Sequence, residues 1–369
     1  MRSLLALDLP LGPPLEAALR RVVDGEDAFC VLDQRLSLRG REEQLSALGA
    51  TAVLSPEGRS ERPEGRLVED EVALVMLTSG SSGPPKAAEL TWSALRASAN
   101  ITQATLRARS APVWCPCLPA NHIGGLAVLL RAVLSDASLL WHDPEDLAGA
   151  ARHGASHVAV VAAHLARFNL SGFYRVLLGG ARAPRDLPEN VVTTWGMTET
   201  GSGVVYDGYA LPGVEVIALE GELCVRSPTL FRGYRGQARA RVLGPDGRDD
   251  WFPTGDAGEV ENGRVRVRGR LGFVINTGGE KLWPEDLEVV VASLPGVRDV
   301  AVTAVEDPEW GERVVALVVS DDANLDDAIR AAAEERLGPW AKPKEIRYVV
   351  AIPRTPNGKV RRSELANLF

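Results

Sequence analysis

Short apolar runs alternate with helical segments between residues 111 and 194, and no other feature of the chain constrains the fold as strongly. Runs typical of buried strands lie at 113–117, 137–141, 157–161, 174–178 and 191–195. Segments with helical spacing lie between them, at 123–134, 144–153 and 162–168. This alternation predicts a wound α/β sheet, whose ligands usually bind in loops at the carboxyl ends of the strands.

The pattern of apolar and glycine residues changes twice in the rest of the chain. Short β runs with glycine-rich turns over about 213–270 predict a small β subdomain appended to the α/β core. Beyond it, expected elements of an α+β domain are a helix at 284–294, strands at 297–305 and 312–320, a helix at 324–337 and a strand at 345–352. We therefore expect a large N-terminal domain over 1–270 and a small mobile C-terminal domain over 271–369. Asp322 or Asn324 is the expected cap of the second helix.

Composition excludes some classes of partner. The 369 residues carry a formal net charge of -8, so no global basic field favours nucleic acid. No apolar run approaches the roughly 18 to 20 residues of a membrane span, and residues 1–20 do not resemble a signal peptide. These patterns predict a cytoplasmic protein that acts on small molecules. They do not distinguish a monomer from a homo-oligomer.

A glycine- and serine-rich loop follows the apolar run VALVML. Such a loop offers closely spaced N–H groups and hydroxyls to phosphate oxygens, and a lysine adds a positive charge. A plain linker has the same composition, and a Walker A loop is excluded because Ala87 follows the lysine. The candidate phosphate-binding residues are Thr78, Ser79, Gly80, Ser81, Ser82, Gly83 and Lys86.

Several further segments resemble motifs of the adenylate-forming enzymes, which comprise acyl-CoA synthetases, luciferases and adenylation domains. The loop at 78–86 is similar to their TSGSTGxPKG signature. The other matches follow in the family's order: GGARAP from Gly179, Gly180 and Ala181; TWGMTET over 194–200; TGD ending at Asp256; GR ending at Arg270; NTGGEK over 276–281; and PNGK ending at Lys359. Each is an ordinary turn by itself, but independent turns have no reason to fall in this order.

The resemblance implies a reaction and a role for each motif. A carboxylate attacks the α-phosphorus of ATP, and pyrophosphate leaves. Thr198 and Glu199 are expected at the α-phosphate, with Glu199 as the ligand of Mg²⁺. Trp195, beside Gly196 and Met197, is expected against the adenine. Asp256 is expected to accept hydrogen bonds from the ribose with the help of Arg270, and Lys359 to bridge the carboxylate and the phosphate.

A narrower resemblance indicates which acid is activated and which acceptor receives the acyl group. The segments around His122 and over 193–208 are similar to the short o-succinylbenzoate–CoA ligases of menaquinone biosynthesis. This similarity implies an acyl pocket at His122, Thr200 and Gly201. It also implies a CoA side at Gly278, Gly279 and Glu280. Gly272 stands at the hinge, where the family usually has Asp or Lys, so the side chain that stabilises either domain orientation is missing there.

Two alternatives remain open at the level of sequence. The chain is either another aryl- or acyl-CoA ligase, or a stand-alone adenylation domain, if the acid or the acceptor differs. A non-catalytic nucleotide-binding homologue is the more remote alternative, since Glu199, Asp256, Arg270 and Lys359 are all retained. ATP, Mg²⁺ and CoA are the expected cofactors.

Overall fold

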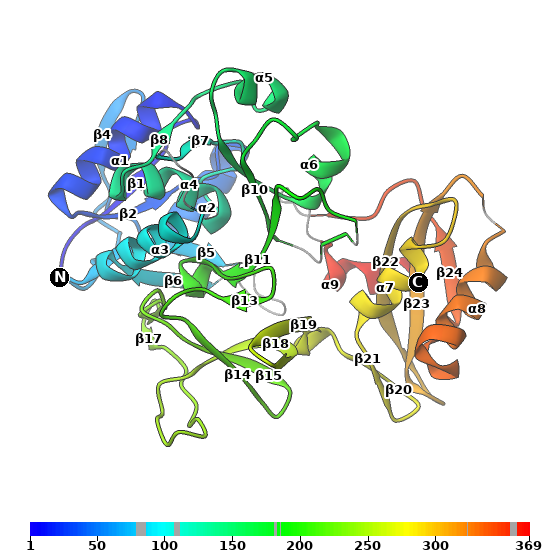
Figure 1. Ribbon diagram of the computed structural model, residues 1–369. Coiled ribbons are helices and arrows are strands. Elements are labelled where there is room, and N and C mark those ends of the chain that lie inside the picture. The colour runs from blue at the N-terminus through cyan, green and yellow to red at the C-terminus, as the bar shows by residue number, and fades with distance from the viewer. Residues whose placement is uncertain (79–85, 107–110, 181–182, 185, 323, 355–359) are drawn as a thin grey trace. The chain divides into compact units, whose positions relative to one another are not determined.

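The computed structural model describes residues 1–369 except 79–85, 107–110, 181–182, 185, 323 and 355–359 (Figure 1). The described chain divides into two compact units. Unit 1 comprises Met1–Val216 and Val225–Phe252, and unit 2 comprises Ile217–Cys224 and Pro253–Phe369. The boundary expected at residues 270 and 271 falls inside unit 2, so a division at that point stays a prediction.

The first sheet of unit 1 is built around three short parallel strands with mostly buried side chains. These are β1 (Leu4–Leu7), β2 (Ala28–Val31) and β3 (Ala52–Ser55). The strand order is β17-β16-β6-β5-β2-β1-β3-β4. The other members are β4 (Gly58–Glu61), β5 (Val72–Thr78), β6 (Lys86–Thr91), β16 (Gly233–Tyr234) and β17 (Gln237–Ala238), and the helices of this region are α1 (Pro13–Gly25) and α2 (Leu38–Leu48).

The second sheet of unit 1 confirms the wound α/β fold expected from the alternating pattern. Its parallel strands run in the order β11-β10-β9-β7-β8. They are β7 (Val113–Cys115), β8 (Ser138–Leu139), β9 (His157–Val160), β10 (Arg175–Leu178) and β11 (Val191–Met197). β7 ends before Pro116, which has no N–H to donate to a neighbouring strand. The antiparallel strands β12 (Ser202–Tyr206) and β13 (Tyr209–Ala210) continue the sheet beyond β11.

Helices of the second sheet fall where the sequence predicts them. They are α4 (Ile123–Leu134), α5 (Leu147–Arg152) and α6 (Ala162–Arg167). α5 begins later than expected because the Asp146 carboxylate accepts the Gly149 N–H at 2.8 Å and so caps the helix there.

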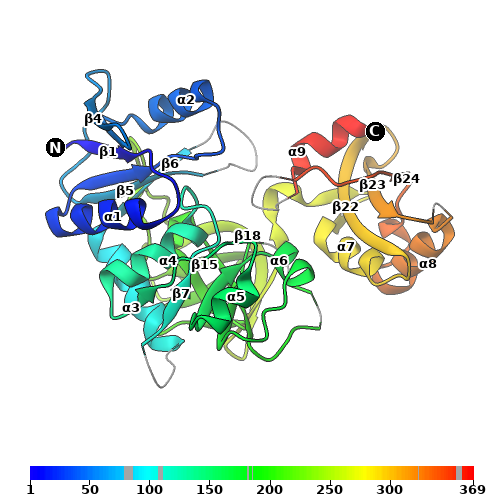
Figure 2. The same ribbon diagram turned by 90° about the horizontal axis from the view of Figure 1, so that it is seen from above.

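One apolar core joins the two sheets of unit 1. α4 lies within it and packs against α1 and α3 (Trp92–Thr105), as Figure 2 shows. Every residue of α4 from 125 to 132 is buried, as expected for a helix that is apolar on all sides. Arg131 is the single charged residue in that stretch, and it is 4% exposed.

Unit 2 begins with antiparallel β structure, in agreement with the glycine-rich turns of the sequence. Its strands run in the order β14-β15-β18-β19. They are β14 (Glu215–Leu219), β15 (Glu222–Arg226), β18 (Phe252–Glu261) and β19 (Arg264–Arg270). β18 and β19 pair with Asp256 opposite Arg270, which places these two residues at neighbouring positions.

The remainder of unit 2 has the expected α+β pattern. A sheet in the order β21-β20-β23-β22, with β24 paired to β23, packs against two helices around an apolar core. Its elements are β20 (Ile275–Thr277), β21 (Glu280–Leu282), α7 (Pro284–Ala292), β22 (Val297–Asp307), β23 (Gly311–Ser320), α8 (Asp326–Leu337), β24 (Glu345–Tyr348) and α9 (Arg362–Leu365).

The expected cap of α8 is wrong. Leu325 occupies the capping position, and no side chain caps the helix. The Asp322 carboxylate instead accepts the Asn324 N–H at 2.8 Å, which forms a turn just before the helix. Among the described residues, no helix is both long enough and apolar enough to cross a membrane.

His157 on β9 gives the fold a specific pH dependence. The ring is fully buried; Nδ1 lies 2.8 Å from the Ser156 hydroxyl and Nε2 lies 3.2 Å from the Leu106 carbonyl. Burial lowers the pKa of His157, and the hydrogen bond to Leu106 offsets this only in part. Unfolding exposes the ring and restores a pKa of about 6.5, so the unfolded chain takes up a proton that the folded chain resists.

We therefore expect the free energy of unfolding to be fully retained above about pH 6.5 and to fall as the pH drops below it, with a contribution from His157 that approaches about 1.4 kcal/mol per pH unit. Urea unfolding at pH 7.5 and pH 5.5 measures the change. His157→Gln should show the smaller loss between the two pH values. Equal losses in the parent and the variant would contradict this assignment.

Candidate active site

The phosphate-loop residues lie at the turn between β5 and β6. Thr78 ends β5 and pairs with Lys86, the first residue of β6, and its hydroxyl donates to the Lys86 carbonyl at 3.2 Å. The structure thus holds the two ends of the loop together. The loop residues Ser79, Gly80, Ser81, Ser82 and Gly83 lie outside the described residues.

The TWGMTET segment forms the end of β11 and the turn after it. Gly196 has no room for a side chain, since a Cβ there would lie 2.2 Å from the Ser202 carbonyl oxygen. Thr200 is fully buried, and its hydroxyl accepts the Met197 N–H at 2.8 Å, which closes the turn at 198–200. Trp195 is half-buried against the core of unit 1. The sequence therefore folds here into a rigid turn rather than a loose loop.

Gly179 and Gly180 follow β10, which is the parallel neighbour of β11. Because parallel strands end at one edge of a sheet, this glycine pair and the turn at 198–200 share the carboxyl edge where ligands usually bind. Ala181, the third residue predicted there, lies outside the described residues.

Tyr234, which none of the motifs includes, contacts both Glu199 and Lys86. Tyr234 of β16 donates its hydroxyl to Glu199 Oε1 at 2.7 Å. The Lys86 ammonium lies 5.0 Å from the centroid of the same ring. The Phe231 N–H donates to the Glu199 carbonyl at 2.8 Å, which fixes the backbone of the turn as well.

The chemistry of Glu199 fits a divalent cation. The residue is 8% exposed, and no cationic side chain of the described chain pairs with it. Oε2 accepts no hydrogen bond from the part of the chain that the structure describes. Mg²⁺ is commonly held by one or two carboxylates together with substrate phosphates, so a single acid is sufficient at such a site. The described residues contain no cluster of three or more His, Cys, Asp or Glu side chains that could hold a metal ion.

The predicted acyl-side residues lie around α4 and the turn at 198–200. His122 is the first residue before α4, and its Nε2 lies 3.1 Å from Asn121 Nδ2. Gly201 has φ +69° and lines a cavity of about 10 Å³ together with Ser98 and Arg131. That volume holds about one water molecule.

Arg131 is the second residue that the motifs did not include. Its guanidinium lies 4.7 Å from the Trp114 ring centroid, and its Nη1 has no hydrogen-bond partner among the described residues. Burial lowers the pKa of Arg131, because the charged form is taken out of water without a carboxylate beside it. A buried cation in this state is a suitable partner for a negatively charged ligand group.

The predicted ribose residues of unit 2 contact each other directly. Asp256 is 7% exposed, and its Oδ1 pairs with Arg270 Nε at 2.9 Å. Arg270 Nη1 also donates to the Thr254 carbonyl at 2.8 Å, and the Asp256 N–H donates to the Thr254 hydroxyl at 3.1 Å. These bonds hold the carboxylate in one orientation.

The predicted hinge and CoA-side residues also lie in unit 2. Gly272 is exposed in the short turn Leu271–Phe273. Gly278 and Gly279 both have positive φ, at +59° and +87°, and form the two-residue turn between β20 and β21; Glu280 begins β21. Lys359, the predicted catalytic lysine, lies outside the described residues.

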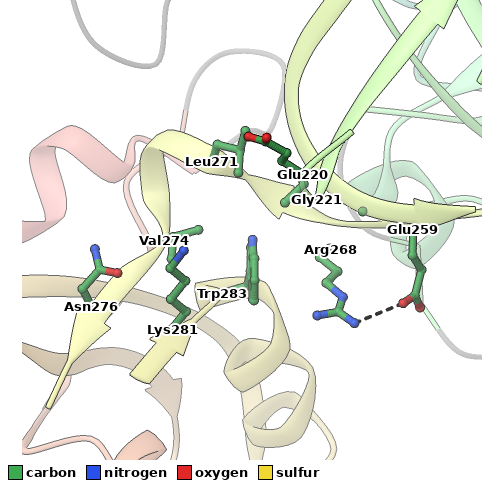
Figure 3. A pocket seen from close by; sticks show the side chains of 11 residues that line it. Glu220, Gly221, Glu259, Arg268, Leu271, Val274, Asn276, Lys281 and Trp283 are labelled. Carbon is green, nitrogen blue, oxygen red and sulfur yellow. Dashed lines mark hydrogen bonds and ion pairs between the residues drawn. The ribbon is translucent and has the colours of Figure 1, made fainter. Parts of the chain in front are cut away.

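A cavity of about 460 Å³ lies within unit 2, next to the hinge turn and the β20–β21 hairpin (Figure 3). Arg268 on one side pairs with Glu259 at 3.1 Å and lies 5.5 Å from the Trp283 ring centroid. Lys281 on the other side pairs with no carboxylate of the described chain. Glu220 also lines the cavity, so two acids and two bases balance within it.

Comparison with known proteins decides the family. The AMP-binding enzyme family matches residues 21–235, and the AMP-binding enzyme C-terminal domain matches residues 286–359. The chain belongs to the AMP-binding enzyme family. The adenylate-forming ligase expected from the ordered motifs and the mixed α/β fold class are therefore confirmed.

Individual relatives of this AMP-binding enzyme are similar over most of its length. A probable 2-succinylbenzoate–CoA ligase of Mycobacterium tuberculosis is 34% identical over 398 residues, which cover 99% of this chain and 98% of the relative. A 2-succinylbenzoate–CoA ligase of Escherichia coli is 30% identical over 309 residues, covering 79% of this chain and 67% of the relative. The solved o-succinylbenzoate CoA synthetase of Bacillus subtilis, in complex with its acyl-adenylate intermediate, shares the fold with a TM-score of 0.83. It is 24% identical and covers 98% of this chain and 88% of that one.

Two residues of the site were missed by the sequence motifs, for different reasons. Tyr234 stands in a short β run without a chemical pattern, so nothing local connects it with Glu199. Arg131 has a detectable signal, because a lone charge in the apolar helix 123–134 is expected to be buried with it. The signal indicates burial, although it does not indicate the ligand.

The ribose role predicted for Asp256 is tested by Asp256→Asn, which keeps the shape of the side chain and removes its charge. We expect the KM for ATP to rise about 10-fold or more, because a hydrogen bond to a charged group contributes roughly 1.5–3 kcal/mol. Glu259→Gln is the matched control, since Glu259 pairs with Arg268 across the same two strands. A steady-state KM for ATP that changes equally in both variants would contradict the role.

Proposed function

We propose that this AMP-binding enzyme is an o-succinylbenzoate–CoA ligase. The carboxylate of the succinyl chain attacks the α-phosphorus of ATP, the bond to the bridging oxygen breaks, and pyrophosphate leaves. The CoA thiol then loses its proton to solvent and attacks the acyl carbon, and AMP leaves with the electron pair of the carbon–oxygen bond. The full-length similarity to proteins named 2-succinylbenzoate–CoA ligase supports this proposal.

The adenylation step is assigned to the residues that the ordered motifs mark. Thr78, Lys86 and the phosphate loop bind the phosphates of ATP, and Thr198 donates to the α-phosphate. Glu199 would hold Mg²⁺, which neutralises charge on the phosphate oxygens when it is bound. Trp195 packs against the adenine, and Asp256 holds the ribose with Arg270. Lys359 bridges the attacking carboxylate and the phosphate.

The main structural support for o-succinylbenzoate as the acid is the burial of Arg131. A substrate with one carboxylate loses that charge when it forms the acyl-AMP ester, so it leaves no acid group of its own to pair with a second buried cation. o-Succinylbenzoate keeps a second carboxylate on its ring throughout the reaction. Arg131 is 4% exposed, its Nη1 has no hydrogen-bond partner among the described residues, and it lies beside Gly201. Its charge would pair with this second group once the cavity of about 10 Å³ between them opens to admit it.

The thioester step is assigned to the other predicted residues of unit 2. Gly278 and Gly279 present backbone rather than side chains, so a thiol chain can approach the hairpin closely. Gly272 supplies the backbone freedom for a domain rotation between the two steps. The enzyme works in the cytoplasm, where ATP and CoA are available.

Pyrophosphate exchange with a panel of acids tests the proposal. The panel holds o-succinylbenzoate, benzoate, a medium-chain fatty acid and 4-oxo-4-phenylbutanoate, which is o-succinylbenzoate without the ring carboxylate. We expect exchange to be fastest with o-succinylbenzoate and CoA-dependent AMP release to follow it. Fast exchange with benzoate or the fatty acid and none with o-succinylbenzoate would overturn the substrate. Adenylation without any CoA-dependent release would overturn the acceptor.

Replacing Arg131 by Met should distinguish binding of the ring carboxylate from binding of the succinyl carboxylate. We expect Arg131→Met to raise the KM for o-succinylbenzoate by about 10- to 100-fold, the range of a charge-assisted hydrogen bond, and to leave the KM for 4-oxo-4-phenylbutanoate within about twofold. The melting temperature should not fall, since an apolar replacement of an unpaired buried charge is neutral or stabilising. An equal rise for both acids would contradict the assignment.

Replacing Lys359 by Ala should separate the two half-reactions. We expect Lys359→Ala to slow pyrophosphate exchange by about 10³-fold, because the ammonium stabilises charge that develops in the first transition state. Thioester formation from supplied acyl-AMP should change far less. Lys342→Ala, which removes a lysine paired with Glu334 on the surface, serves as the control. Equal losses in both half-reactions would contradict the role.

A further inference from the structure

Tyr234 contacts two opposite charges, each of which has its own role in the proposed reaction. Its ring has the Lys86 ammonium 5.0 Å from the centroid, and its hydroxyl donates to Glu199 Oε1 at 2.7 Å. No carboxylate of the described chain pairs with Lys86. Glu199 is 8% exposed and Lys86 is exposed, and opposite charges that contact one side chain attract each other unless something keeps them apart.

The position of Tyr234 is fixed by the backbone around it. Tyr234 pairs with Ala88 of β6, two residues beyond Lys86, and the Arg235 N–H donates to the Ala87 carbonyl at 2.7 Å. The Phe231 ring contacts the Tyr234 ring edge-on at 5.0 Å between centroids. Gly233 allows this close pairing, since a Cβ there would lie 2.4 Å from the Gln237 carbonyl oxygen. The backbone from which the ring projects is therefore fixed by the sheet, and the Phe231 ring packs against the ring itself.

We propose that Tyr234 is a positioning residue that keeps Lys86 and Glu199 from pairing with each other. The ring face holds the ammonium by a cation–π contact, and the hydroxyl occupies one carboxylate oxygen. Glu199 Oε2 then stays available to the divalent cation, and the Lys86 ammonium stays available to phosphate. This inference rests on the proposed function, because it assigns both charges to the metal–nucleotide complex.

The two contacts of Tyr234 predict different effects when they are removed. Tyr234→Phe keeps the ring between the charges and removes only the hydrogen bond to Glu199. Tyr234→Leu removes the ring as well, so Lys86 can reach Glu199 and neutralise it. Tyr348→Phe is the matched control, because Tyr348 also donates its hydroxyl to a carboxylate, Asp326 Oδ1 at 2.9 Å, in unit 2.

Binding of the Mn²⁺–ATP complex without any acid measures these effects. Electron paramagnetic resonance of the enzyme-bound ion is compared with that of the same Mn²⁺ and ATP without protein. We expect Tyr234→Phe to weaken Mn²⁺ binding about 10-fold, the effect of one hydrogen bond to a charged group, and Tyr348→Phe to change it less than twofold. Tyr234→Leu should weaken binding by about 100-fold. In pyrophosphate exchange, saturating Mg²⁺ should restore the kcat of Tyr234→Phe to within about threefold of the parent and should not restore that of Tyr234→Leu.

Equal Mn²⁺ affinities in the parent and in Tyr234→Phe would overturn the hydrogen-bond contribution, and a Leu variant no weaker than the Phe variant would overturn the separation of charges. Both outcomes leave the proposed function intact, because the parent still binds the metal–nucleotide complex. A parent chain that fails to bind Mn²⁺ with ATP would instead count against the proposed function itself.

Discussion

Backbone hydrogen bonds between three distant segments of unit 1 fix the main chain that carries Glu199 and Lys86. The N–H groups of Phe231, Arg232 and Arg235 donate to the carbonyls of Glu199, Glu89 and Ala87, respectively, at 2.8, 2.8 and 2.7 Å. One short segment thereby ties the turn that carries Glu199 to the strand that begins with Lys86. The side chains of that turn and that strand can act together because the main chain between them is rigid.

The same arrangement explains which parts of the fold and site were visible in the sequence. Strands β7 to β11 and helices α4 to α6 were predictable, because each is signalled by the periodicity of its own residues. The motifs of the site were predictable through their order along the chain. Tyr234 was not, because its two partners lie 35 and 148 residues away and only sheet pairing brings them together.

Errors at the level of sequence were confined to the ends of elements. Asn324 and Asp322 have the right chemistry for a helix cap, but the chain uses Asp322 for a turn and starts α8 two residues after Asn324. α5 likewise begins at the residue after its cap, Asp146, rather than at the start of its polar run. Local side-chain hydrogen bonds decide such boundaries, and several polar residues in a row compete for them.

The buried guanidinium of Arg131 has a consequence for the free energy of unfolding as well as for the proposed specificity. Unit 1 folds around a guanidinium that is largely removed from bulk water and whose Nη1 has no hydrogen-bond partner in the described part of the chain, which costs folding free energy. A ligand that supplies the missing anion binds the folded chain and has no such partner in the unfolded one, so it shifts the folding equilibrium. An anion bound at Arg131 would therefore raise the free energy of unfolding as well as contribute to specificity.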